Sequence, residues 1–200
     1  MKRIKINFIC LIVLVIILNI TGCASIYVDN NTKEINSSQF KKPEPLHPAQ
    51  LLFEFQTKGV ANARATDILK SHVIDQVKNS GLFSSVTEGK AEGGAVLSIT
   101  LNNVPLTDDA FSKGFVTGLT FGLAGSEVSD GYVCTARYIV GTSNENIVKQ
   151  ARHAIHTTMG AKSAPANATK AASMEEAATL MTRQVVSNVL NDLSHDDKFK

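Results

Sequence analysis

Residues 132–158 read YVCTARYIVGTSNENIVKQARHAIHTT, and this stretch decides the class of fold. In its first third, Cys134, Ala136 and Tyr138 alternate with Thr135 and Arg137. A period of two is typical of a strand that buries one face. A polar turn follows at residues 142–146, and residues 147–158 then continue as a second strand, so the stretch predicts an antiparallel β-hairpin.

Further elements precede the hairpin. Residues 96–103 (VLSITLNN) alternate in the same way, and residues 51–56 (LLFEFQ) form a short strand candidate. Residues 63–79 carry apolar side chains at four-residue spacing, which predicts a helix with one buried face. These side chains are Ala65, Leu69, Val73 and Val77. Gly81 follows as the expected left-handed stop.

A second helix closes the chain. Ser173-Met174-Glu175-Glu176 is a capping box. Apolar residues then recur every three or four positions through Leu193, which predicts a helix of about 20 residues. The order strand, helix, strands, hairpin, helix predicts an α+β domain in which two helices pack on one face of a mainly antiparallel sheet.

The first 22 residues have the organisation of an export signal. Three basic residues precede an apolar run, Phe8 to Leu18, which is shorter than the roughly 20 residues that a spanning helix needs. Ile20-Thr21-Gly22-Cys23 resembles the bacterial lipobox, which implies cleavage before Cys23 and lipidation of its thiol. The alternative is an ordinary signal peptide in which the cysteine is incidental. Ala24 in place of aspartate implies sorting to the outer membrane, with the domain in the periplasm.

Residues 23–50 lack a regular period. They include three consecutive polar residues at 29–31 and three prolines, Pro43, Pro45 and Pro48. We therefore predict a flexible tether between the lipidated cysteine and a single domain at residues 51–200.

An unusual insertion at residues 107–130 separates two predicted strands. Its centre, residues 114–125, reads GFVTGLTFGLAG and carries no charge. Glycines at every fourth position allow close packing on one helical face; they are Gly114, Gly118 and Gly122. The candidate contacts with the membrane or with a protein partner are Phe115, Leu119, Phe121 and Leu123. The alternative is a glycine-rich loop buried against the domain.

Candidate catalytic and metal-binding residues are few. His153 and His156 lie three residues apart, so a strand directs them to opposite faces, where we expect a half-buried and a solvated histidine rather than a metal site. Cys134 falls on an apolar face, as a small buried hydrophobe does. Glu175-Glu176 suits a helix N-terminus, and Asp108-Asp109 follows a strand. We therefore predict no enzyme activity, no cofactor and no metal.

Charge argues against a nucleic-acid partner. The chain has 20 Lys and Arg against 18 Asp and Glu, and three of the basic residues lie in the signal. Phosphate binding needs a clustered basic surface, which this balance does not provide.

The chain resembles the small outer-membrane lipoproteins of proteobacteria with a YajG-like or TolB-N-terminal-like α+β domain. The resemblance rests on the lipobox, on Asn79-Ser80-Gly81-Leu82-Phe83 ahead of a strand, and on the closing helix around residues 184–193. It implies an accessory or assembly factor of the cell envelope, and we expect the glycine-rich insertion to make its contact with the membrane or a membrane-protein partner. The alternative is a periplasmic module that binds a soluble ligand or peptidoglycan on its open sheet face.

Overall fold

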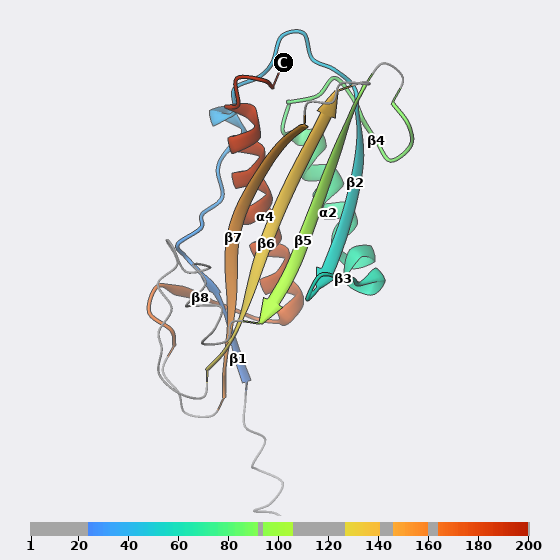
Figure 1. Cartoon of the computed structure of the whole chain (residues 1–200). Helices are drawn as coiled ribbons and strands as arrows, with labels where there is room; N and C mark the ends of the chain where they lie inside the picture. The colour runs from blue at the N-terminus through green and yellow to red at the C-terminus, as the bar shows by residue number, and fades with distance from the viewer. Residues whose placement is uncertain (1–23, 92–93, 106–126, 141–145, 160–163, 200) are drawn as a thin grey trace, which may run out of the picture.

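The computed structural model describes residues 24–91, 94–105, 127–140, 146–159 and 164–199. Within them a single sheet runs in the order β3-β2-β5-β6-β7-β1-β8, and β4 pairs with β2 (Figure 1). The longer strands are β2 (Ala49–Thr57), β5 (Ala95–Pro105), β6 (Glu127–Val140) and β7 (Asn146–Met159). The shorter strands are β1 (Ala24–Asp29), β3 (Val60–Ala61), β4 (Val86–Thr87) and β8 (Ala168–Ala171).

The predicted hairpin is confirmed. β6 and β7 pair antiparallel from Glu127↔Thr158 to Ile139↔Asn146, and β5 pairs antiparallel with β6. β2 and β5 are parallel, because helix α2 lies between them in the chain and returns the backbone to the same end of the sheet. The α+β class with a mainly antiparallel sheet is therefore confirmed.

Both predicted helices are present on one face of the sheet (Figure 1). Helix α2 (Ala63–Asn79) is capped by Asn62, whose side chain accepts a hydrogen bond from Ala65 N–H. Gly81 follows with φ 71°, a conformation that glycine adopts without strain. In α4 (Met174–Ser194), the Ser173 hydroxyl accepts a hydrogen bond from Glu176 N–H, as the capping box predicts.

The core lies between the sheet and these helices. Its strand residues are the inward-facing halves of the predicted alternations, with Ile99, Leu101, Cys134 and Ala136 fully buried. Cys134 is thus the buried small hydrophobe that its position predicts. The tertiary packing of this apolar layer, rather than helix propensity, accounts for most of the stability of α2 and α4.

The predicted flexible tether is wrong for the residues that follow Cys23. Ala24–Asp29 form β1, which pairs antiparallel with β7 on one side and with β8 on the other. Val28 is fully buried and Tyr27 is 8% exposed. Farther along, residues 37–39 form a short 3₁₀ helix, η1 (Ser37–Gln39), and Phe40 is buried in the core. The local sequence does not indicate β1, because β7, the strand with which it pairs, lies more than a hundred residues away in the chain.

A second difference is a strand, β8, that the sequence pattern does not predict. β8 begins at Ala168 and forms the outer edge of the sheet beside β1. The predicted insertion also ends earlier than expected, because residues 127–130 already belong to β6. The signal peptide, Cys23 and residues 106–126 lie outside the described residues. No helix in the described part of the chain is long and apolar enough to cross a membrane.

Candidate functional site

One end of the sheet collects the segments that sequence analysis singled out. β1 begins there with Ala24, directly after Cys23, and Ala24 pairs with Met159 at the end of β7. On the other side of β7, Glu127 pairs with Thr158. Glu127 directly follows residues 106–126, so the residue after Cys23 and the residue after the insertion lie at the same end of the sheet. We call this end, defined by Ala24, Glu127 and Met159, the anchor end.

The predicted contact residues in the insertion fall outside the described part of the chain, as do the glycines proposed to pack them. Phe115, Leu119, Phe121 and Leu123 therefore remain predictions, and so do Gly114, Gly118 and Gly122. The structure describes the two residues that flank the segment, Pro105 at the end of β5 and Glu127 at the start of β6.

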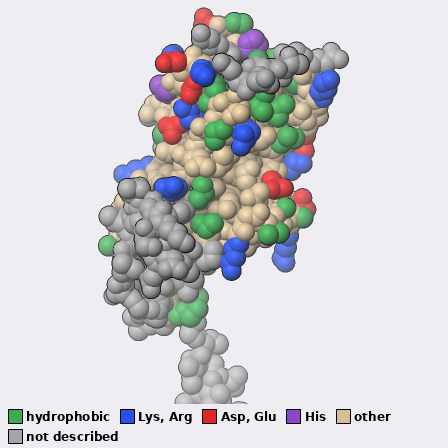
Figure 2. Space-filling view, viewed as in Figure 1, with side chains coloured by type: hydrophobic (Ala, Val, Ile, Leu, Met, Phe, Trp, Pro, Cys, Tyr) green, Lys and Arg blue, Asp and Glu red, His purple; other side chains and the backbone are tan. Residues whose placement is uncertain are grey.

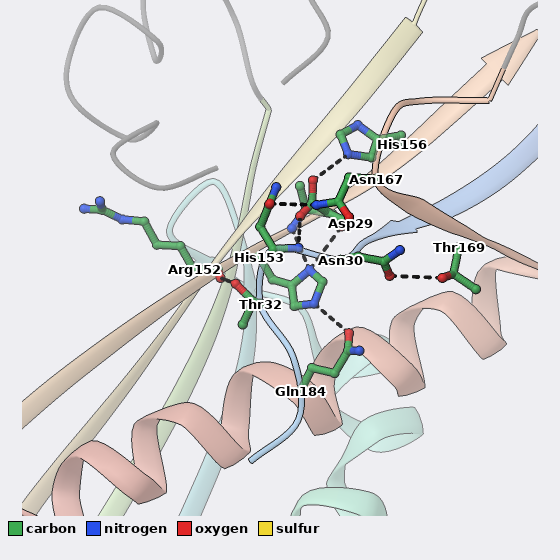
Figure 3. A network of polar contacts seen from close by, with 11 residues as sticks. Asp29, Asn30, Thr32, Arg152, His153, His156, Asn167, Thr169 and Gln184 are labelled. Atoms are coloured by element: carbon green, nitrogen blue, oxygen red, sulfur yellow. Dashed lines mark hydrogen bonds and ion pairs between the residues drawn. The ribbon is translucent and has the colours of Figure 1, made fainter. Parts of the chain in front are cut away.

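A buried histidine fixes β7 to α4 near the anchor end (Figure 3). His153 is fully buried, and its Nδ1 accepts a hydrogen bond of 2.8 Å from Ala154 N–H. That leaves Nε2 to donate to Gln184 Oε1 at 2.7 Å. Burial lowers the pKa of His153, and the hydrogen bond to Gln184 opposes this shift without overcoming it. His153 is therefore a neutral cross-link between sheet and helix.

On the opposite face of β7, His156 approaches β1. Its Nε2 lies 3.4 Å from Asp29 Oδ2, and Asp29 Oδ1 accepts a hydrogen bond of 2.7 Å from Asn31 N–H. His156 is 2% exposed and Asp29 is fully buried. The prediction that His156 is solvated was wrong, since residues 153–156 are buried on both faces of β7. The polar pairing instead joins β7 to the strand that follows Cys23.

The segment after β1 is held by further hydrogen bonds (Figure 3). Thr32 Oγ1 donates to the carbonyl of Arg152 at 2.8 Å. The Asn30 side chain accepts a hydrogen bond of 3.0 Å from the hydroxyl of Thr169, which lies in β8. These contacts cross more than a hundred residues of chain, so they fix the start of the folded domain to its last two strands.

The arrangement offers no recognisable catalytic set within the described residues. His153 and His156 point away from each other, and no three His, Cys, Asp or Glu side chains come together among the residues that the structure describes. Burial raises the pKa of Cys134 to about 12, which keeps its thiol protonated and unreactive at neutral pH. The polar groups near the anchor end act as structural links between elements.

An apolar pocket of about 350 Å³ opens between the first turns of α2 and α4, on the half of the sheet toward the anchor end. Phe55 from β2 and Tyr132 from β6 form its sheet side, with ring centroids 6.4 Å apart. Its helix side is formed by Ala65, Ile68, Leu69, Met174, Glu175 and Ala178. Burial raises the pKa of Tyr132, and the nearby Asp130 carboxylate adds to this effect. The lining suits an apolar occupant.

A second pocket, of about 360 Å³, is polar and lies between α2, α4 and residues 34–40. Its cationic group, Arg183, is already paired with Glu34, at 2.8 Å between Nε and Oε2. Gln76 donates to the Arg183 carbonyl at 2.7 Å, which ties the two helices together. The positive charge of Arg183 is therefore balanced by a carboxylate of the same domain.

Sequence analysis missed both the Asp29–His156 pairing and the apolar pocket. The alternation of Ile26 and Val28 with Ser25 and Tyr27 is a weak strand signal, and the polar residues after it conceal the strand. Phe55 and Tyr132 were placed correctly on strands, but nothing in their local pattern indicates that they share a pocket.

No protein-family model matches the chain, and no curated protein matches it. Among solved structures, a dodecamer of a point variant of PelC from Paraburkholderia phytofirmans is similar, with 14% identity and a TM-score of 0.32. That similarity covers 87% of this chain and 98% of the other. A PelC dodecamer from the same organism in another crystal form has 12% identity and a TM-score of 0.34 over 86% and 96% of the two chains. Both TM-scores are too low to carry a functional conclusion.

Proposed function

We propose that this chain is a non-catalytic lipoprotein of the bacterial envelope, anchored in the outer membrane through Cys23 with its domain in the periplasm. It serves as an accessory or assembly factor, and it contacts the membrane or a membrane-protein partner through the glycine-rich segment at residues 114–125. The resemblance to small outer-membrane lipoproteins supports the same class of function.

The observation that carries the proposal is the pairing of Ala24 with Met159. A cysteine acylated at position 23 has no tether after it, so the anchor holds the end of the sheet directly at the lipid surface. The insertion returns to the sheet at Glu127, beside the same end of β7. Anchoring would therefore raise the effective concentration of residues 114–125 at the membrane.

The decisive experiment labels growing cells with radioactive palmitate. The wild-type chain should take up label and sediment with the outer membrane, whereas Cys23→Ser should remain an unlabelled precursor. Normal labelling of Cys23→Ser would overturn the proposal. Combining Phe115→Ser with Phe121→Ser in the acylated chain should leave the palmitate label intact and reduce recovery of the partner or the depth of membrane contact. Unchanged contact in that variant would remove the insertion from the proposal.

A second candidate function is supported by the open face of the sheet (Figure 2). Thr100, Thr135 and Gln150 form a polar row across β5, β6 and β7, and Gln150 Nε2 donates to the Thr135 hydroxyl at 3.1 Å. Hydroxyl and amide groups of this kind can bind a polar soluble ligand or peptidoglycan. Sedimentation with purified peptidoglycan, lost in Thr135→Val, would favour this function over the first.

A further inference from the structure

Exposed apolar side chains lie at the edge of the apolar pocket. Ile68 is 48% and Met174 43% exposed, and Val60, in β3 beside the end of β2, is 70% exposed. Ile68 and Met174 line the apolar pocket. An exposed apolar rim around an apolar pocket marks a surface that meets lipid or another apolar partner.

The position of the anchor selects lipid as that partner. Tyr132, on the sheet side of the pocket, pairs with His153, six residues along β7 from Met159. Six strand residues span roughly 20 Å. Since Ala24 pairs with Met159, the Tyr132 side of the pocket lies about that far along the sheet from the residue that follows Cys23, so a domain anchored there can bring the pocket to the membrane. Acyl chains are then the apolar groups present at the highest effective concentration.

The chemistry of the lining agrees with an acyl chain. Only two polar side chains, Tyr132 and Glu175, line the pocket, and the rest of the lining is hydrocarbon, an aromatic ring and a thioether. Glu175 lies in the first turn of α4, where the helix dipole favours its negative charge. A carboxylate at the pocket disfavours a free fatty acid, whose own carboxylate it would repel, and is compatible with a zwitterionic phospholipid.

We propose that the pocket between the first turns of α2 and α4 accommodates an acyl chain of a membrane phospholipid, with Ile68 and Met174 in contact with the lipid surface. The inference rests on the proposed anchoring through Cys23. It gives the protein a second attachment to the membrane, nearer the β2 edge of the sheet than β1 is, and therefore a defined orientation there. The exposed residues around Val60 carry charges of both signs, Lys58 and Asp67 among them. The contact therefore does not depend on attraction by one sign of charge, and it should survive high salt.

The test uses the intact lipoprotein in phosphatidylcholine vesicles whose acyl chains are brominated. Single cysteines are introduced at Ile68 and Met174 and labelled with a polarity-sensitive fluorophore. Leu52→Cys and Val148→Cys are matched controls, because Leu52 is 46% and Val148 43% exposed, against 48% for Ile68 and 43% for Met174. The native thiol of Cys134 is fully buried and should not take up the label.

Labels at positions 68 and 174 should be blue-shifted and quenched several-fold more than labels at 52 and 148, and 1 M salt should not change the result. Equal quenching at all four positions, or none at 68 and 174 in protein that stays bound to the vesicles, would overturn the pocket proposal while leaving the anchor intact. Protein that fails to stay with the vesicles would instead defeat the proposed anchoring, and the pocket proposal with it.

A second measurement tests occupancy of the pocket itself. A photoactivatable phosphatidylcholine should cross-link to wild-type protein at residues that line the pocket. Ala178→Phe fills the pocket and should reduce the yield several-fold, while Leu52→Phe on the open face should leave it unchanged. Circular dichroism establishes that both variants fold. Undiminished cross-linking in folded Ala178→Phe would overturn the proposal.

Discussion

The centre of the sheet and its anchor end differ in the polarity of their buried side chains. At the centre, Ile99, Leu101 and Cys134 meet the helices in a layer that is fully buried and apolar. At the anchor end, the buried side chains include the polar Asp29, His153 and His156. Short-range alternation specifies the first region, whereas contacts across more than a hundred residues specify the second.

The difference determines what it costs to disturb each region. Removing an apolar side chain from the centre leaves a cavity, whose cost grows with the volume lost. Removing one partner of a polar pair leaves the other buried without its hydrogen bond, and the cost is the desolvation of that group. A cavity weakens the whole domain, while a lost polar pair near the sheet edge should act first on β1, because this strand has only six residues.

The largest effect should follow Leu101→Ala, because Leu101 is fully buried opposite Cys134 in the β5–β6 ladder. We expect the free energy of unfolding to fall by about 2–5 kcal/mol, measured by urea denaturation. Leu52→Ala on the open face, where Leu52 is 46% exposed, should cost less than about 1 kcal/mol. Similar losses in the two variants would show that the centre is not the tightly packed region.

An intermediate effect is expected for Asp29→Ala, which removes the partner of His156 and the acceptor of Asn31 N–H. The loss should be about 1–3 kcal/mol. Amide hydrogen exchange should accelerate mainly at residues 26–28, with α4 little affected. Glu34→Ala breaks a half-exposed ion pair with Arg183 and should cost no more than about 1 kcal/mol. If exchange in α4 accelerated as much as in β1, the anchor end would not be a separable region.

The smallest effect is a pH dependence from His153. Burial lowers its pKa below the ordinary value of 6.5, so below that pH the unfolded chain binds more protons than the folded one. The contribution of His153 to stability is complete above pH 6.5 and is lost as the pH falls, by at most about 1.4 kcal/mol per pH unit.

Urea denaturation between about pH 7 and pH 5 measures this slope. His153→Gln removes the titrating group and keeps a side chain that can hydrogen-bond Gln184, so its slope should be shallower than that of the wild type. His72→Gln, at an exposed position on α2, provides the matched control. A wild-type slope in His153→Gln would show that His153 is not the group responsible.

The sequence by itself determined the regular elements. The alternation in residues 132–158 and 96–103 predicted strands that are present, and the two strands of the hairpin pair as expected. The capping residue Ser173 and the stop at Gly81 bounded the helices correctly. These signals are local, because side-chain period, capping and left-handed glycine depend only on neighbours within a few residues. The burial of Cys134 followed from the same alternation.

Only the tertiary structure decided that Ala24–Asp29 form a strand, that His156 is buried, and that Phe55 and Tyr132 share a pocket with Met174. Each depends on a partner far away in the chain: β1 on β7, His156 on Asp29, and the pocket on two helices that strands β4 to β8 separate in the sequence. A six-residue strand has no stability of its own and exists through the hydrogen bonds and burial that its neighbours provide. The local sequence of residues 24–29 therefore carries little record of the strand, while the fold that surrounds it requires one.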